Sequence, residues 1–239
     1  MCRFISECNH LNFEFISIEN NPILMKKEIN KKLYLASLTV NFIFIFGLCV
    51  LIFINRQKIY ERLFPRRQVD VVLFGDSLTF EGDWNNLLTS KSILNKGTSG
   101  TTSSELTKSM RRKVLIHHPK ICFIQAGTND IGLGIPIPRI IANFDTLLHT
   151  MQRHHIIPVI QLVVYNNNNP QKNLTIDTLN AGLKCLIENN AIDFIDLNDF
   201  LSENKLLKKE CTYDGVHFNR TAYTLWSSKI NLLLKKYRI

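Results

Sequence analysis

The sequence predicts an α/β fold with three layers, in which a parallel sheet lies between two layers of helices, preceded by one transmembrane helix. Short apolar runs without polar alternation recur along the chain, as expected of strands buried on both faces. Each run is followed by a stretch with helical periodicity, and this alternation is typical of parallel sheets with right-handed crossovers. An uncharged segment near the amino terminus is long enough to cross a bilayer.

That uncharged segment runs from Leu33 to Ile54 and contains neither a charged residue nor proline. As a helix rising ~1.5 Å per residue, its 22 residues extend about 33 Å, against a hydrocarbon core of ~30 Å. The chain has 239 residues and a net charge of +9, and much of the basic excess brackets this segment. The bracketing residues are Lys26, Lys27, Lys31, Lys32, Arg56, Lys58, Arg62, Arg66 and Arg67. This placement favours a membrane flank over a nucleic-acid surface, so no nucleic-acid partner is expected.

The segment is longer than the apolar core of a cleaved signal peptide, and no A-x-A site follows it. We therefore expect an uncleaved, single-pass anchor. The predicted organisation is a cytoplasmic-side segment at residues 1–32, the anchor at 33–54, a basic linker at 55–68 and the α/β domain at 69–239. Basic residues at both ends leave the orientation open, although an extracytoplasmic domain is favoured. Met25 is an alternative start.

The domain begins with the apolar run 71–74, which Gly75 ends. The predicted strands are residues 71–74, 93–95, 121–126, 157–164 and 191–197. The predicted helices are residues 79–89, 140–152, 174–188 and 221–236, with a further helix opened by the capping-box sequence Thr102-Ser103-Ser104-Glu105. Five strands alternating with helices fit a flavodoxin-like, doubly wound sheet.

Polar residues and glycines follow the predicted strands at one edge of this sheet, where ligands bind in open α/β folds. Ser77, Gly100 and Asn129 come after the first three strands, and Asp214 and His217 lie in the loop before the last helix. Each residue alone is also an ordinary turn or cap residue. Their occurrence together, in this order and at strand ends, favours a catalytic site.

Together these residues make a serine nucleophile and its supports. His217 can take the proton of Ser77, and Asp214 can orient the imidazole and stabilise its charged form. The backbone N–H groups of Ser77 and Gly100 and the side-chain amide of Asn129 are candidate donors to an oxyanion.

The motifs resemble those of the SGNH, or GDSL, hydrolase family. Gly75–Leu78 reads GDSL, and Ser77 falls on the family's nucleophile. Gly100 and Asn129 fall on the oxyanion-hole glycine and asparagine, and Asp214-Gly215-Val216-His217 matches the block that supplies Asp and His. The resemblance covers roughly residues 69–236. Thr101 departs from the aspartate of many relatives, at a position that is not catalytic in the family.

The resemblance implies an esterase, lipase, thioesterase or carbohydrate deacetylase that uses no metal and no cofactor, acting on a small-molecule, glycan or lipid ester. It does not choose among these substrates. The apolar segment 131–138 and the polar segment 165–170 are candidate substrate walls or simply loops. A catalytically inactive binding module on the same fold is the alternative. A nucleotide or flavin binder is disfavoured, because the segment after the first strand has no G-x-G-x-x-G and no P-loop lysine.

Six cysteines are present, at positions 2, 8, 49, 122, 185 and 211, without C-x-x-C or metal-ligand spacing. A disulfide framework is therefore not expected, although one bridge involving Cys185 or Cys211 stays open.

Overall fold

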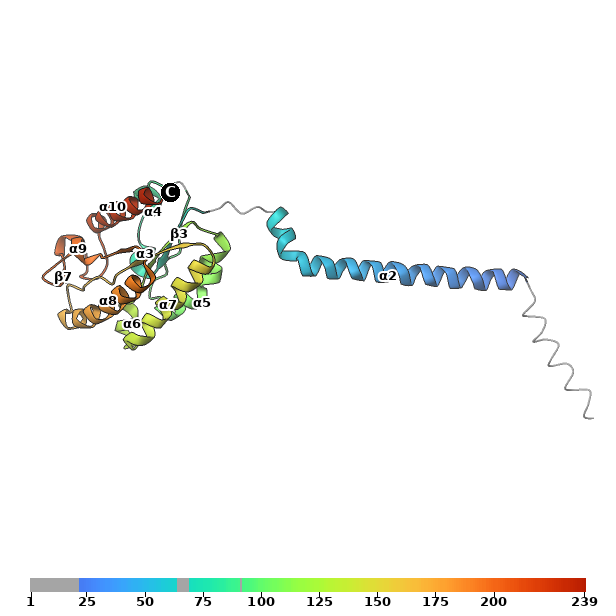
Figure 1. Cartoon of the computed structure of the whole chain (residues 1–239), viewed down its shortest axis with the longest axis horizontal. Coiled ribbons are helices and arrows are strands. Elements are labelled where there is room, and N and C mark those ends of the chain that lie inside the picture. Colours follow the sequence, from blue (N-terminus) through green and yellow to red (C-terminus); the bar gives the residue numbers. More distant parts are fainter. Residues whose placement is uncertain (1–21, 64–68, 91) are drawn as a thin grey trace, which may run out of the picture. The chain divides into compact units, whose positions relative to one another are not determined.

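The computed structural model describes residues 22–63, 69–90 and 92–239 (Figure 1). The chain divides into two compact units, Met1–Arg66 and Arg67–Ile239. Most of the segment expected on the cytoplasmic side, and residues 64–68 of the expected linker, lie outside the described residues.

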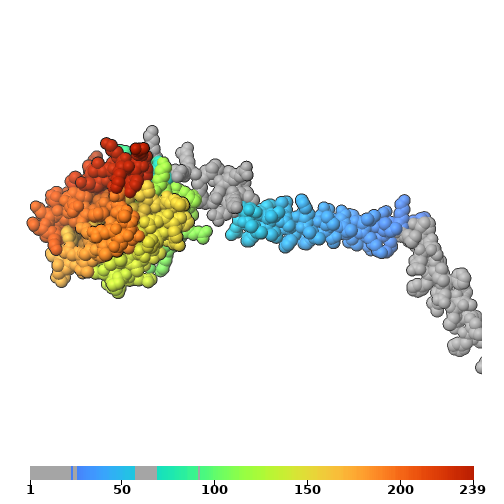
Figure 2. Space-filling view, viewed as in Figure 1, coloured from blue at the N-terminus to red at the C-terminus, as the bar shows by residue number. Residues whose placement is uncertain are grey.

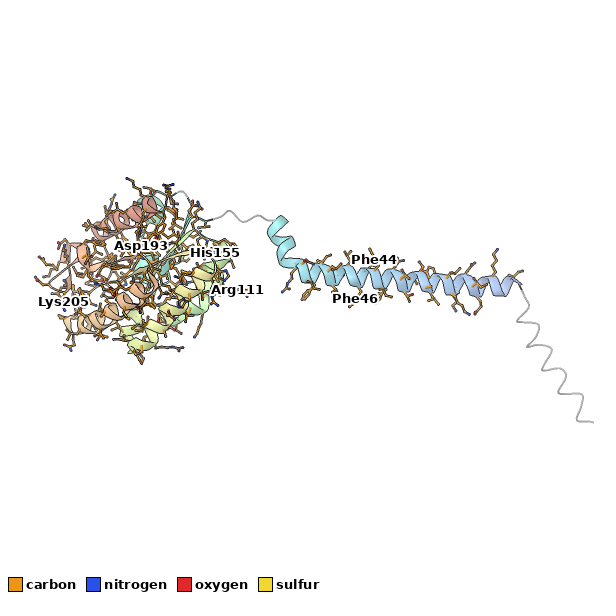
Figure 3. All side chains as sticks on the ribbon, in the orientation of Figure 1. Phe44, Phe46, Arg111, His155, Asp193 and Lys205 are labelled. Carbon is orange, nitrogen blue, oxygen red and sulfur yellow. The ribbon has the colours of Figure 1, made fainter. Side chains whose placement is uncertain are left out.

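The described part of the first unit is one helix, α2, at Pro22–Leu63. It contains the uncharged segment and extends beyond it at both ends, so residues 55–63 of the expected linker are helical. Its apolar side chains are exposed all round: Phe44 and Phe46 are 71% and 63% exposed and point to opposite sides (Figure 3). The span Lys26–Arg56 is long and apolar enough to cross a membrane, a property that anchors share with signal sequences.

The second unit contains the predicted five-stranded parallel sheet. Its strands are β1 at Val71–Gly75, β2 at Ile93–Asn95, β3 at Ile121–Gln125, β4 at Ile157–Gln161 and β5 at Phe194–Ile195. The order is β2-β1-β3-β4-β5, and every neighbouring pair is parallel. This confirms the predicted fold class. The order also places the ends of β1, β2 and β3 side by side.

Helices cover both faces of the sheet and bury a separate core on each (Figure 1). One face is covered by α5 at Ser103–Lys113, α7 at Ile137–Arg153 and α8 at Pro170–Asn190. The other is covered by α4 at Trp84–Leu87, α9 at Asn198–Leu201 and α10 at Arg220–Lys236. The space-filling view shows α7, α8 and α10 forming much of one surface of this unit (Figure 2).

The helix predicted at residues 79–89 is wrong, because two short helices, α3 at Ser77–Phe80 and α4, replace it. The chain breaks at Gly82, where a Cβ would lie 2.3 Å from the Trp84 ring. Trp84 is buried and donates its ring N–H to the Thr79 carbonyl at 2.7 Å. Burial of this indole thus overrides the helical periodicity.

The fourth and fifth strands are also shorter than predicted. After β4 the Leu162 N–H still donates to the Ile195 carbonyl of β5 at 2.9 Å, but at Val163 a side-chain amide takes the place of a neighbouring strand. Asn180 accepts from the Val163 N–H at 2.9 Å and donates to its carbonyl at 2.8 Å. After β5, the chain forms α9 and a small antiparallel hairpin, β6 at Ser202–Glu203 with β7 at Leu206–Leu207, before it reaches α10.

The structure describes four of the cysteines, and all four are free: Cys49 and Cys185 are exposed, and Cys122 and Cys211 are buried.

Candidate active site

Ser77 is the first residue of α3, directly after β1. The turn into the helix requires Gly75, since a Cβ there would lie 2.3 Å from the Thr79 hydroxyl and 2.4 Å from the Gln125 carbonyl oxygen. Asp76 caps the helix, its Oδ1 accepting from the Leu78 N–H at 3.0 Å. The half-buried Ser77 side chain thus lies at the carboxyl edge of the sheet.

His217 reaches Ser77 from the loop before α10. Its Nε2 is 3.2 Å from the Ser77 Oγ, and its Nδ1 is 2.6 Å from Asp214 Oδ2. The other carboxylate oxygen, Oδ1, accepts the backbone N–H groups of Val216 at 2.9 Å and His217 at 2.7 Å. Gly215, with a φ of +87°, supplies the left-handed turn that folds this loop back on itself. A continuous hydrogen-bonded chain therefore joins the carboxylate, the imidazole and the hydroxyl.

Hydrogen bonds keep the Asp214 carboxyl ionised, and Tyr213 packs against the His217 ring. Partial burial raises the pKa of Asp214, but hydrogen bonds from the His217 ring and from the backbone N–H groups outweigh it and bring that pKa to about 2. The carboxylate is therefore ionised near neutral pH. Tyr213 stacks on His217 with ring centroids 5.9 Å apart, and donates its hydroxyl to Glu81 at 3.0 Å.

Gly100 belongs to the loop after β2, which is held against the end of β1. The Lys96 N–H donates to the Leu73 carbonyl at 2.7 Å, and the Thr98 N–H donates to the Gly75 carbonyl at 2.9 Å. Gly100 has a φ of +74°, and a Cβ there would meet open space. Its requirement for glycine is therefore conformational rather than steric. Among the described residues, none accepts a hydrogen bond from its N–H.

Asn129 belongs to α6 at Thr128–Gly132, a short helix that the sequence patterns did not indicate. Its amide nitrogen donates to the Thr101 carbonyl at 3.0 Å, which leaves the second amide hydrogen available. This bond ties the loop after β3 to the residue next to Gly100. Hydrogen bonds thus join the β1, β2 and β3 ends, and the loop of His217, at one edge.

Sequence reasoning assigned no role to the buried Asp130, which connects these loops. Its carboxylate accepts the Ser103 N–H at 2.9 and 3.1 Å and the Ser103 hydroxyl at 2.6 Å. Asn143 of α7 donates to the same hydroxyl at 2.9 Å. Asp130 directly follows Asn129, but its partner lies 27 positions away. Nothing local in the sequence indicates that contact.

Asp76 is a buried carboxyl beside the nucleophile. Burial raises the pKa of this carboxyl to about 7. The hydrogen bond from the Leu78 N–H, and then Gln125 and the electrostatic effect of His217, lower the pKa but offset the effect of burial only in part. Among the described residues, its Oδ2 has no hydrogen-bond partner. The folded state therefore favours the protonated, neutral carboxyl.

We expect Asp76→Asn to raise the melting temperature at high pH. The pKa of Asp76 in the folded protein is about 7, against the usual 3.8. The stability that the bound proton contributes to the folded state is therefore complete below pH 3.8 and is lost as the pH rises through about 7. Asparagine stays neutral and keeps the acceptor for the Leu78 N–H. Melting curves from pH 4 to 8 should therefore diverge, with the wild type falling below the variant. The exposed Asp199→Asn serves as the control; parallel curves for Asp76→Asn and wild type would contradict the expectation.

A cavity of about 480 Å³ lies beside α6. It is lined by both segments singled out as candidate substrate walls, the apolar one through Ile131 and Ile135 and the polar one through Asn169. The polar segment also touches the His217 loop, because Asn168 donates to the Asp214 carbonyl and the Asn167 N–H donates to the Gly215 carbonyl at 2.9 Å. The lining of this cavity is therefore part apolar and part polar.

No group of three or more His, Cys, Asp or Glu side chains placed to hold a metal ion occurs within residues 22–63, 69–90 and 92–239.

The chain is similar in sequence to known proteins. The sequence profile of the GDSL-like Lipase/Acylhydrolase family matches residues 73–225. N-acylneuraminate cytidylyltransferase of Streptococcus agalactiae is 26% identical over 180 residues, which cover 75% of this chain but only 42% of that protein. The chain thus matches less than half the length of this curated relative.

Solved structures share the fold. A GDSL-like lipase from Bacteroides thetaiotaomicron is 23% identical, with a TM-score of 0.65, covering 71% of this chain and 89% of its own. An acetyl xylan esterase is 20% identical, with a TM-score of 0.62, covering 70% of this chain and 100% of its own.

Proposed function

Since the chain belongs to the GDSL-like lipase/acylhydrolase family, we propose that it is a serine esterase that cleaves acetyl or short acyl esters of carbohydrates or lipids. The observation that carries the proposal is the hydrogen-bonded chain from Asp214 through His217 to the Ser77 hydroxyl. A serine needs an adjacent base and an orienting acid to attack a carbonyl near neutral pH, and these contacts supply both.

In the proposed reaction, the Ser77 Oγ attacks the ester carbonyl while its proton passes to His217 Nε2. The tetrahedral intermediate collapses as His217 returns the proton to the departing alcohol, leaving an acyl-serine. Water, activated by the same nitrogen, then releases the acid and restores the hydroxyl. Asp214 holds Nδ1 protonated throughout and stabilises the imidazolium.

The negative oxygen of the intermediate needs fixed donors. We assign this task to the backbone N–H groups of Ser77 and Gly100 and to the second amide hydrogen of Asn129. No described residue accepts from either N–H, so both are free to meet an oxyanion. The Thr101 carbonyl holds the Asn129 amide in place before substrate arrives, which avoids a cost of reorganisation during the reaction.

Acetyl esters are the first substrates to test, because an acetyl xylan esterase shares the fold. We expect the full-length protein in detergent to hydrolyse p-nitrophenyl acetate and butyrate faster than palmitate, and to release acetate from an acetylated glycan. EDTA should not inhibit it, because the proposed chemistry uses only protein side chains. Loss of activity with EDTA and recovery with zinc would contradict this mechanism. No hydrolysis of any ester would favour the inactive binding module.

We further propose that α2 anchors the protein in the membrane, with the esterase unit on the extracytoplasmic side. None of the 31 residues of its span, Lys26–Arg56, is buried in the described structure. The intact chain should stay in the membrane pellet after extraction with alkaline carbonate and should dissolve in detergent. Release by carbonate would exclude the anchor, and a shortened mature chain would indicate a cleaved signal sequence instead.

A further inference from the structure

A groove of about 740 Å³ runs along α5, beside the loop that carries Gly100. Thr98 and Thr101, which bracket Gly100, form its wall nearest the candidate site. The remaining lining residues follow α5 and the turn after it: Glu105, Lys108, Ser109, Arg111, Arg112, Lys113 and Ile116. At ~1.5 Å per residue, the helical part of the groove extends for more than 10 Å.

The groove contains four basic side chains and a single acidic one. Among the described residues, none of the four makes a salt bridge. The acid, Glu105, is engaged by the capping box, where it accepts the Thr102 N–H at 2.8 Å and the Thr102 hydroxyl at 3.1 Å. Figure 3 marks Arg111, an exposed side chain of this cluster, on the second unit. The positive charge of the groove is therefore poorly compensated.

The behaviour of Lys113 agrees with this crowding. Partial burial, followed by repulsion from Arg112 and from Lys96 of the neighbouring loop, lowers its pKa. Basic residues in a last helical turn complement the helix dipole, which accounts for Arg111, Arg112 and Lys113 in part. It does not account for Lys108 or Lys96, which lie outside that turn. A bound anion would relieve the repulsion at Lys113 and offset the positive charge of its neighbours.

A hydrogen bond also joins this basic cluster to the loop that carries Gly100. The Lys113 ammonium donates to the Thr98 hydroxyl, and the Thr98 N–H donates to the Gly75 carbonyl, two residues before Ser77. An anion held in the groove would thus lie beside the Gly100 loop. A contact with a flat lipid surface would not require a concave site connected to this loop.

We propose that this groove is a substrate subsite for esters whose alcohol part carries a carboxylate, sulfate or phosphate group. This inference rests on the proposed esterase function, and it narrows the substrate class from esters in general to acylated anionic molecules. Lysine and arginine form charge-assisted hydrogen bonds with such groups, and these are stronger than neutral ones. The anion would hold the alcohol side of the ester while the acyl carbon meets Ser77.

The test compares acetate release from acetylated polygalacturonate, which is anionic, with release from acetylated xylan, using the full-length protein in detergent. The measured quantity is the ratio of the two kcat/KM values. Lys108→Gln/Arg112→Gln should lower this ratio roughly ten- to a hundredfold, as expected for loss of hydrogen bonds to charged groups. The matched control, Lys229→Gln/Lys235→Gln, removes the same charge from α10 and should leave the ratio within about twofold of wild type. Salt at 0.5 M should narrow the wild-type preference.

A groove variant that is folded and active but keeps the wild-type ratio would overturn the subsite, while the esterase assignment would stand. If it keeps the ratio but loses affinity for micelles containing phosphatidylglycerol, the groove contacts lipid headgroups, and the proposal is equally overturned. Absence of all hydrolysis would instead refute the proposed function. In that case, calorimetry measures the binding of unacetylated polygalacturonate to the wild type, the groove variant and the α10 control variant. Loss of binding in the groove variant alone supports the anion subsite, and equal binding by all three proteins refutes it.

Discussion

Replacing Ser77 by alanine is expected to lower kcat for the best ester by about 10⁴–10⁶-fold, leaving only the background that the oxyanion donors and binding provide. The hydroxyl is the atom that we propose attacks the carbonyl, and its Oγ is 3.2 Å from His217 Nε2. The rate should be measured with the full-length protein under saturating substrate. Ser228→Ala, at an exposed position on α10, is the matched control.

His217→Ala should lower kcat nearly as much as Ser77→Ala does. The double variant should have a kcat only slightly below that of either single variant. Both residues serve one proton transfer, so their effects are far from additive. His149 offers a matched control, since it also pairs with a carboxylate, Asp145, at 3.2 Å, but in an exposed position on α7. Wild-type rates in Ser77→Ala would show that the carbonyl is attacked elsewhere or that the activity is a contaminant.

Asp214 and His217 set the expected pH dependence of the reaction. Because the pKa of Asp214 is about 2, its carboxylate stays ionised over the working range. A general base accepts a proton only in its neutral form, so activity should fall as the pH is lowered. Asp214→Asn should lower kcat less than His217→Ala does, because the carboxylate orients and stabilises the imidazole without itself transferring the proton.

Replacing Asn129 by alanine is expected to lower kcat by about 10²–10³-fold with little change in KM. The donor meets a charge that exists only in the transition state, so its loss leaves ground-state binding largely intact. Steady-state kinetics on p-nitrophenyl acetate separate the two parameters. A rise in KM at constant kcat would show that Asn129 binds the substrate rather than the oxyanion.

A control is needed because Asn129 also holds the Thr101 carbonyl at 3.0 Å. Thermal unfolding of Asn129→Ala should reveal at most a small loss of stability, typical of one hydrogen bond at ~1 kcal/mol. Asn86→Ala, which removes an exposed amide bonded to Asp83 at 2.8 Å, provides the comparison. A collapse of stability in Asn129→Ala alone would make its kinetics uninformative about catalysis and would assign the residue a structural role instead.

The sequence alone determined the fold class and the candidate residues because both depend on local patterns. Strands buried on both faces must be apolar, and the order of alternating strands and helices restricts the topology to very few. The capping box at Thr102 and Glu105 and the turn at Gly75 are likewise interactions between near neighbours. The five candidate residues, Ser77, Gly100, Asn129, Asp214 and His217, could be named because each follows a strand or lies before the last helix.

Only the tertiary structure decided how the elements end and what surrounds the site. Asn180 bonds the backbone of Val163 after β4, 17 positions away, and Asp130 holds Ser103 across 27 positions. The groove along α5 arises where the Gly100 loop meets a helix whose charges look like an ordinary solvated face in the sequence. Contacts of this kind depend on which segments the fold brings together. The residues next to a side chain in the sequence do not identify a partner that lies many positions away.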